Sequence, residues 1–317
     1  MRARARFGFE GATALISGGM AEPLGGIGAP CLELLNITQP REVRAAHDRY
    51  LAAGASVLRT NTANASPERL DRYRMHDEAF IVCYMAAEHA RDAVTRAQDA
   101  DGIARTILGV ARVEPGSRST GFLPLDRVEA ATRTMASGLA GGGADAILLE
   151  AAQDPARLTA AVSGARRGMA DAGRVLPIHL KLRYDPLFDV PSRARVTSDL
   201  VAAASQAAGM NLAGLSLAPI NLVDGWRDTL CAMARVFGGS LFAESARNIS
   251  DLADLISDPV IGPRLGMIGG GLTSDDTVLL RQLLDQAERP EPLPVRMAAN
   301  DTGHDGDLRD IWSGQAG

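Results

Sequence analysis

Charged and hydroxyl side chains recur where short apolar segments of the chain end. These positions are Ser17, Arg59, Asn61, Arg112, Glu114, Glu150, Lys181, Arg183, Asp185, Ser216 and Glu244. Carboxylates and cations that share one pocket can orient a zwitterionic or acidic small ligand through charge-assisted hydrogen bonds. A solvated rim of salt bridges is the plainer interpretation of any single residue among them.

Segment 177–183 has a second chemical pattern, because its apolar residues alternate with His179, Lys181 and Arg183. A strand places alternate residues on opposite faces, so the three basic side chains should share one face. If that face is interior, the basic residues must pair with acids such as Glu150 or reach a ligand. Lys181 could then form a Schiff base with a carbonyl ligand, or serve as a structural ion pair.

Eight short apolar segments, each beside a glycine, a proline or a polar break, predict buried strands. They are Ala12–Ser17, Ser56–Thr60, Thr106–Ala111, Asp145–Glu150, Pro177–Leu182, Ala213–Leu217, Ser240–Ala243 and Leu265–Ile268. Helical spacing with start signals lies between them. The predicted helices are Val43–Leu51, a long segment from Pro67 through Ala97, Val128–Leu139, Ala156–Ala170, Ser198–Ala208, Trp226–Phe237, Asn248–Ile256 and Asp276–Gln286.

Alternating strands and helices predict an α/β fold with parallel pairing, and eight such units fit a single (β/α)8 TIM barrel. A doubly wound sheet is the rival, but no G-x-G-x-x-G follows the first strand. In such barrels the active site lies at the carboxyl ends of the strands, where the charged residues fall. We expect the barrel to span residues 1–287, with a polar C-terminal tail or arm at 288–317.

Composition narrows the classes of function. The 317 residues are 46% hydrophobic and 22% charged, with a formal charge of −5, which predicts a soluble globular protein and argues against nucleic acid as the partner. No apolar run of ~18 residues occurs, so we do not expect a membrane partner. We expect a cytoplasmic location. The three cysteines, Cys31, Cys83 and Cys231, are expected to be reduced thiols.

Three segments together resemble the homocysteine S-methyltransferase family. Leu34-Leu35-Asn36-Ile37-Thr38-Gln39-Pro40, followed by Ala53-Gly54-Ala55 and Thr60-Asn61-Thr62, is similar to the family's N-L-T-x-P, A-G-A and T-N-T run. Gly142–Glu150 is similar to the strand that ends in the family's Glu-Thr, and Met267–Gly270 to its last strand and paired glycines. The resemblance implies that Glu150 holds the amino group of the ligand.

The departures from the family pattern concern its zinc ion, which the family binds through one cysteine after strand six and two after the strand-eight glycines. Here those positions carry Leu217, Gly271 and Leu272, whose side chains offer no donor for zinc. We therefore expect no zinc site. Without zinc, another cation or base must activate a thiol, which is only a few per cent ionised at neutral pH.

The resemblance implies a methyltransferase-like barrel that acts on a small amino-acid-like or methylated ligand. The predicted substrate-binding residues are Ser17, Gly18, Asn61, Glu150, Arg183 and Ser216. Lys181 and Glu244 are the predicted catalytic residues, and they would take the place of the family's zinc site. Two alternatives stay open: a non-catalytic binding subunit of a corrinoid or folate methyl-transfer system, and a metal-free Schiff-base lyase or aldolase that uses Lys181.

The expected partners follow from the same analysis. The chain should bind a small-molecule ligand, and a corrinoid- or folate-binding protein is the partner that could carry the methyl group. The sequence assigns no cofactor to the chain itself, and it leaves a homodimer open.

Overall fold

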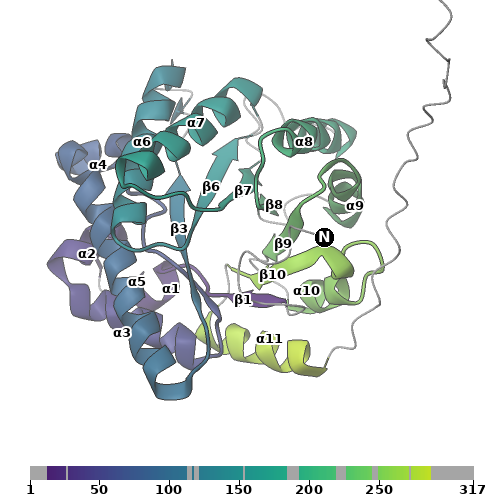
Figure 1. The fold of residues 1–317 in the computed structure, drawn as a ribbon, viewed down its shortest axis with the longest axis horizontal. Helices are drawn as coiled ribbons and strands as arrows, with labels where there is room; N and C mark the ends of the chain where they lie inside the picture. Colours follow the sequence, from purple (N-terminus) through teal and green to yellow (C-terminus); the bar gives the residue numbers. More distant parts are fainter. Residues whose placement is uncertain are drawn as a thin grey trace, which may run out of the picture.

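The predicted strands pair side by side and close into a barrel (Figure 1). The computed structural model describes residues 13–25, 28–112, 116–117, 121–152, 154–183, 193–218, 226–244, 249–270 and 273–286. Within them the barrel strands are β1 (Ala14–Ile16), β2 (Val57–Arg59), β3 (Thr106–Arg112), β6 (Ala146–Ala152), β7 (Ile178–Arg183), β8 (Gly214–Ala218), β9 (Ser240–Glu244) and β10 (Leu265–Gly269). Their order is β1-β10-β9-β8-β7-β6-β3-β2, with every neighbouring pair parallel. The predicted (β/α)8 barrel is confirmed.

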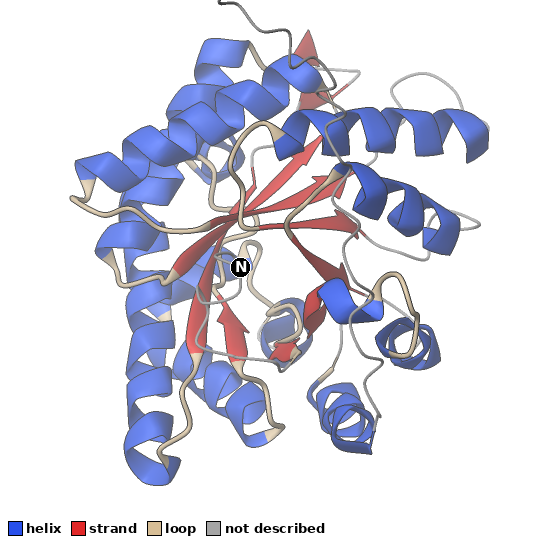
Figure 2. Ribbon diagram, turned by 45° about the vertical axis from the view of Figure 1, so that its right-hand side comes forward, coloured by secondary structure: helices blue, strands red, loops and turns tan. Residues whose placement is uncertain are grey.

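Helices surround the strands on the outside of the barrel (Figure 2). They are α1 (Ala21–Leu24), α2 (Leu35–Thr38), α3 (Pro40–Ala52), α4 (Pro67–Leu70), α5 (Ala79–Asp101), α6 (Leu125–Gly141), α7 (Pro155–Asp171), α8 (Arg193–Ala208), α9 (Trp226–Val236), α10 (Ile249–Ile256) and α11 (Ser274–Gln286). A small antiparallel pair, β4 (Gly116–Ser117) and β5 (Gly121–Phe122), lies between β3 and α6 in the chain. None of the helices described has both the length and the apolar character needed to cross a bilayer.

The segment from Pro67 through Ala97 differs from the single long helix that its spacing predicts. Helix α4 ends at Leu70, two 3-10 turns follow, and α5 begins only at Ala79. Arg74 adopts a left-handed conformation with φ 59° between the two turns, which interrupts the helical hydrogen-bond pattern. The predicted tail at 288–317 lies outside the described residues, so the boundary at 287 stays a prediction.

Two apolar layers hold the barrel together. The interior contains Ile16, Leu108, Leu148, Phe242 and Met267 with four smaller neighbours, all buried. The other faces of the strands pack against the helices, and Ile178, Leu180 and Leu182 of β7 belong to that outer layer. His179 instead contacts the Phe242 ring, with centroids 6.0 Å apart, so it lies inside. The predicted division of segment 177–183 into an apolar and a basic face is therefore confirmed for its described side chains.

Helices α5, α6 and α7 approach one another closely at glycines. A Cβ atom at Gly138 of α6 would lie 2.5 Å from the carbonyl oxygen of Phe80 in α5. A Cβ atom at Gly168 of α7 would lie 2.2 Å from the carbonyl oxygen of Arg133 in α6. Both distances are shorter than any real contact of this kind, so the helix spacing depends on these two positions lacking a side chain.

We expect Gly138→Ala to lower the free energy of unfolding by about 1–3 kcal/mol, because the added methyl group forces α5 and α6 apart. Urea denaturation measures the change. Gly141→Ala is the matched control on the same helix, because its Cβ would lie 3.5 Å from Tyr84, an ordinary contact. That control should be neutral or stabilising by up to ~1 kcal/mol through helix propensity. Equal stability of the two variants would contradict the packing argument.

Of the buried histidines, His47 and His179 lie in different layers of the fold. His47 of α3 is 0% exposed and His179 of β7 is 1% exposed. Burial lowers the pKa of each from 6.5 to about 3, and the nearby His89 contributes to the shift at His47. Both imidazoles are therefore neutral in the folded protein at neutral pH.

These two pKa shifts make stability fall with acid. The unfolded chain takes up protons on both rings below pH 6.5, while the folded chain does so only near pH 3. The free energy of unfolding should therefore be highest above pH 6.5 and fall between 6.5 and 3, by ~1 kcal/mol per pH unit for each histidine. His47→Gln should give a shallower pH dependence in urea titrations between pH 6 and 4. An unchanged slope would show that His47 does not contribute.

Candidate active site

Four charged side chains meet inside the barrel at the carboxyl ends of the strands. Arg59 comes from β2, Glu150 from β6, Lys181 from β7 and Glu244 from β9, and each is buried. We call these four residues the charge ring. The pairs of ring residues that touch are between 31 and 185 residues apart in the sequence. The ring therefore depends on closure of the barrel.

Cations and carboxylates alternate around the charge ring. Arg59 donates from Nη2 to Glu150 Oε1 at 2.7 Å and from Nη1 to Glu244 Oε2 at 3.3 Å. Lys181 Nζ donates to Glu150 Oε1 at 3.3 Å and to Glu244 Oε2. Each carboxylate thus shares one oxygen between both cations. The other oxygen of Glu244, Oε1, is buried and accepts no hydrogen bond from the described residues.

Electrostatics within the ring favour the charged state of the guanidinium. Burial opposes the charge of Arg59, but the nearby Glu244 and Glu150 outweigh it and raise the pKa of Arg59 above its ordinary value. The guanidinium of Arg59 is thus a permanent cation at the centre of the barrel opening on the carboxyl side of the strands, which we call the mouth.

Strand register and Gly270 position the ring. Glu150 of β6 is paired with Lys181 of β7, which is paired in turn with Ser216 of β8, so the three lie at the same height in the barrel. After β10 the chain passes close to Glu244, since a Cβ atom at Gly270 would lie 2.8 Å from the Glu244 Cδ. Gly270 also has φ 75°, which favours glycine. The second of the paired glycines therefore leaves room for the carboxylate.

The structure brings only part of the predicted substrate-binding set to the ring. Ser17 Oγ accepts a hydrogen bond from the backbone N–H of Arg59 at 2.9 Å, and Gly18 follows it in buried backbone. Ser216 is 0% exposed beside Lys181. Arg183 ends β7, and its side chain lies outside the described part of the structure. Glu114 and Asp185 also lie outside the described residues.

Asn61 has a different setting from the one its position suggested. Its Nδ2 donates to the Leu32 carbonyl oxygen at 2.7 Å and to Asn36 Oδ1 at 3.1 Å. Asn36 donates in turn to the Asn61 carbonyl oxygen at 2.9 Å. These hydrogen bonds connect the T-N-T segment to the loop that follows β1, so Asn61 supports the wall of the mouth.

A second polar network, partly missed in the sequence, adjoins the ring. Glu33 is 4% exposed and accepts hydrogen bonds from Asn64, whose side-chain oxygen accepts from Arg112 Nη2 at 2.6 Å. Arg112 Nη1 lies 3.8 Å from Glu150 Oε2. Arg112 stood among the strand-end charges, whereas Glu33 and Asn64 gave no signal because neither residue ends a predicted strand.

The three thiols of the chain are spread over different elements. Cys83 is in α5 and Cys231 is in α9. Cys31 directly precedes a 3-10 turn at Leu32–Leu34, and its Sγ lies 3.4 Å from Glu33 Oε2. Burial and the nearby Glu33 raise the pKa of Cys31 to about 11, and burial raises the pKa of Cys83 as well. None of these cysteines lies in the segment directly after β8 or β10, where the resemblance places the family's zinc thiolates.

Other donors do not replace that set in the described part of the chain, where no three His, Cys, Asp or Glu side chains come together as a metal site. Of the positions that replace the zinc ligands, Leu217 is on β8 with its side chain outside the described part. Gly271 and Leu272 lie outside the described residues altogether. A metal held by Cys31 with Glu150 and Glu244 finds no support in this geometry.

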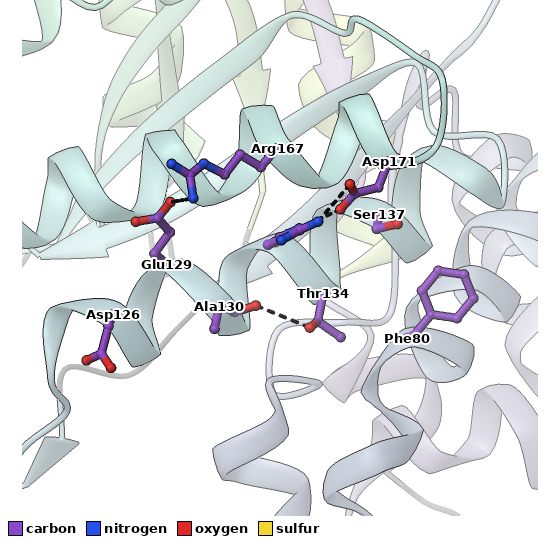
Figure 3. A pocket seen from close by; sticks show the side chains of 9 residues that line it. Phe80, Asp126, Glu129, Ala130, Thr134, Ser137, Arg167 and Asp171 are labelled. Carbon is purple, nitrogen blue, oxygen red and sulfur yellow. Dashed lines mark hydrogen bonds and ion pairs between the residues drawn. The ribbon is translucent and has the colours of Figure 1, made fainter.

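A groove on the outside of the barrel is separate from the charge ring. It is lined by Phe80 of α5 and by residues of α6 and α7, among them Asp126, Ser137 and Asp171. Figure 3 shows Glu129 and Arg167 pointing toward one another there, and their ion pair measures 3.0 Å. Glu129 and Arg167, and likewise Arg133 and Asp171, form ion pairs between α6 and α7, so these charges converge on one another and not on a common point in the groove.

Comparison with known proteins agrees with this fold. A model of the homocysteine S-methyltransferase family matches residues 12–215, well over half of the chain. Methionine synthase of Mycobacterium leprae is 31% identical over 190 residues, which cover 59% of this chain and 15% of that protein. Methionine synthase of Mycobacterium tuberculosis is 34% identical over 150 residues, covering 47% and 12%. The chain thus spans less than a sixth of the length of these relatives.

Solved structures show the same barrel. The metallated form of the Escherichia coli homocysteine methyltransferase MmuM has a TM-score of 0.67 at 17% identity, covering 85% of this chain and 96% of that one. An octameric ribulose-1,5-bisphosphate carboxylase/oxygenase from Pyrococcus horikoshii scores 0.53 at 13% identity, covering 89% and 61%. At these identities the likeness concerns the fold alone. With the family match, however, the chain belongs to the homocysteine S-methyltransferase family.

The ring predicts strong coupling between its members. Lys181→Met removes one of the two cations that face Glu150 and Glu244, and we expect it to lower the free energy of unfolding by about 3–5 kcal/mol. In Lys181→Met/Glu244→Gln the loss should be smaller than the sum of the single losses, with a coupling of about 1–3 kcal/mol in urea titrations.

The control for this cycle is Arg133→Met with Asp171→Asn, an exposed pair between α6 and α7 that measures 2.6 Å. Solvent screens this pair, so its coupling should be much the smaller of the two. Additive losses at Lys181 and Glu244 would show that the ring is not a coupled unit.

Proposed function

We propose that this chain is a methyltransferase-like barrel that binds a small amino-acid-like or methylated ligand at the charge ring and works without the family's thiolate-held zinc. The observation that carries the proposal is the ring itself, in which Glu244 Oε1 is a buried acceptor with no hydrogen-bond donor among the described residues. A buried carboxylate oxygen of this kind favours a ligand that brings a donor.

The roles of the ring residues follow from their contacts. A ligand ammonium can donate hydrogen bonds to the carboxylates of Glu150 and Glu244, both of which accept from Arg59. A methylated cation would be stabilised by the same two negative charges. The ligand ammonium then takes the place of the Lys181 ammonium in its ion pairs with the two carboxylates. Binding therefore leaves little buried charge without a partner.

Methyl transfer to a thiol needs a thiolate, and the ring offers two groups for this step. The ammonium of Lys181 supplies a positive charge that stabilises a thiolate nearby. Glu244 Oε1 can accept the thiol proton while the sulfur electron pair attacks the methyl carbon and the donor leaves with its bonding pair. Together these residues replace the charge that zinc supplies in the family.

The first test measures binding of L-homocysteine and L-methionine by calorimetry, and methyl transfer from methylated sulfonium and ammonium donors, with and without a metal chelator. We expect Glu150→Gln to weaken binding about tenfold or more through loss of a charged hydrogen bond, and the chelator to have no effect. Glu129→Gln, a carboxylate on the outside of α6, is the control. Equal binding by wild type and Glu150→Gln, or loss of binding on chelation, would refute the proposal.

A non-catalytic binding subunit of a corrinoid or folate methyl-transfer system is the second candidate. It is favoured by the missing thiolates and by the fact that the matched relatives are much longer enzymes than the segment they share with this chain. Ligand binding without turnover, together with complex formation with a corrinoid- or folate-binding protein, would distinguish this function. Turnover by the purified chain would exclude it.

The Schiff-base alternative is tested at the same residue. Lys181 Nζ donates to both ring carboxylates, and imine formation would have to break both contacts. Borohydride trapping of a carbonyl ligand on Lys181 would establish that chemistry.

A further inference from the structure

Lysine occurs once in this chain, and that lysine lies in the charge ring. The sequence contains 33 lysine and arginine residues together, and Lys181 is the single lysine among them. Arginine therefore supplies the charge at every other such position, including Arg59 of the same ring. A lysine kept in such a chain favours a role for the ammonium group itself, because the two side chains are not equivalent cations.

The contacts of Lys181 are those that a ligand ammonium would make. Its Nζ donates to Glu150 Oε1 at 3.3 Å and to Glu244 Oε2, so one small cation bridges both carboxylates. The ammonium of an amine ligand has the same charge, the same donors and a similar size. The two ammonium groups therefore compete for the same acceptor oxygens.

Arg59 bridges the same carboxylates in a different way. Its Nη2 donates to Glu150 at 2.7 Å and its Nη1 to Glu244 at 3.3 Å, so the planar guanidinium is held at two nitrogens. Weak hydration suits a guanidinium to a buried site. Lys181 is instead a strongly hydrated point charge on a flexible stem, and such a stem can carry its head toward water. Of the two ring cations, Lys181 is therefore the one that an incoming ammonium replaces.

The charges of the ring balance, since two cations face two carboxylates. An ammonium that takes over the carboxylates separates the Lys181 ammonium from its partners. A charge that loses its partner in a buried site is costly. A ligand that also carries an anionic group removes this cost, because the released ammonium pairs with that group. The number of ion pairs is then the same before and after binding.

We propose that Lys181 is a displaceable counter-ion of the charge ring. A ligand ammonium replaces it between Glu150 and Glu244, and the released Lys181 ammonium pairs with an anionic group of the same ligand, a carboxylate or a thiolate. This inference rests on the proposed function, because it takes the ring as the ligand site. It makes Lys181 a specificity-determining residue that selects against amines without an anionic group.

The test compares three probes by calorimetry on the full chain. 3-(Methylsulfanyl)propylamine carries only the ammonium, L-methionine adds a carboxylate, and 3-sulfanylpropylamine has a thiol in place of the thioether. We expect at least one of the two latter probes to bind the wild type about tenfold more tightly than the first. If the thiolate is the partner, binding releases the thiol proton, which calorimetry in buffers of different ionisation enthalpy detects.

Lys181→Met removes the internal competitor. Its affinity for 3-(methylsulfanyl)propylamine should rise about tenfold or more, because the carboxylates then lack one cation. The affinity for the probe that the wild type prefers should rise less or fall, because its anionic group loses its partner. A merely structural role of Lys181 would lower every affinity. Arg133→Gln on α6 is the surface control and should leave all three affinities unchanged.

Lys181→Arg keeps a cation in the ring and guards against loss of folding in Lys181→Met. The forked guanidinium can hold both carboxylates at separate nitrogens, so it is harder to displace. We expect this variant to bind all three probes about tenfold more weakly than the wild type. Affinities equal to those of the wild type would show that no displacement takes place.

The single lysine gives a direct measurement on the wild type. Protein made with isotope-labelled lysine has one lysine side-chain signal in nitrogen NMR, because Lys181 is the only lysine. Saturation with 3-(methylsulfanyl)propylamine should speed hydrogen exchange of this ammonium with water, because it leaves its ion pairs. Unchanged or slower exchange with the amine bound would overturn the inference.

The outcomes separate this inference from the proposed function. Weaker binding of the amine by Lys181→Met than by the wild type would overturn the inference and leave the ring as the ligand site. Equal affinity of the wild type for all three probes would also overturn it. Displacement of Lys181 by L-methionine without methyl transfer from any sulfonium or ammonium donor would support the inference, while the methyltransferase function would be wrong.

Discussion

Closure of the barrel forces four charged side chains from distant parts of the chain into contact at one end. Arg59 and Lys181 each form ion pairs with both carboxylates, Glu150 and Glu244. Neither cation could remain buried without that arrangement, because desolvation opposes an isolated charge. The charge state of the mouth therefore depends jointly on strands β2, β6, β7 and β9.

Such a ring contributes little to folding compared with the apolar layers beneath it. Replacing buried ion pairs with well-packed apolar residues is often neutral or stabilising, while removal of one partner is costly. The interior below the ring is already filled by Leu148, Phe242 and their neighbours. Those layers keep water from the lower side of the ring and strengthen its electrostatic interactions. Under the proposed function, these four buried charges serve ligand binding and not stability.

The relation to the homocysteine S-methyltransferase family shows how one scaffold can carry a different mouth. The glycines after β10 are kept, and Gly270 leaves room for the Glu244 carboxylate. The resemblance places Leu217, Gly271 and Leu272 at the family's thiolate positions, while cations and carboxylates occupy the ends of neighbouring strands. Strand-end residues can change in this way because the packed layers of the barrel do not depend on them.

The sequence by itself determined the elements and the residues at their ends. Apolar runs beside glycine and proline located all eight barrel strands, since burial requires such runs locally, and the alternation in 177–183 predicted the interior positions of His179 and Lys181. Local signals failed at 71–78, where Arg74 interrupts a helical spacing, and at Glu33 and Asn64, which carry no periodic pattern. Only the tertiary structure decided which charges pair in the ring, where Arg59 and Lys181 each contact both Glu150 and Glu244. It also decided the structural contacts of Asn61 and the hydrogen bonds that connect Glu33 and Asn64 to Arg112. Each of these depends on distances between segments that are remote in the chain, and barrel closure and strand register set those distances.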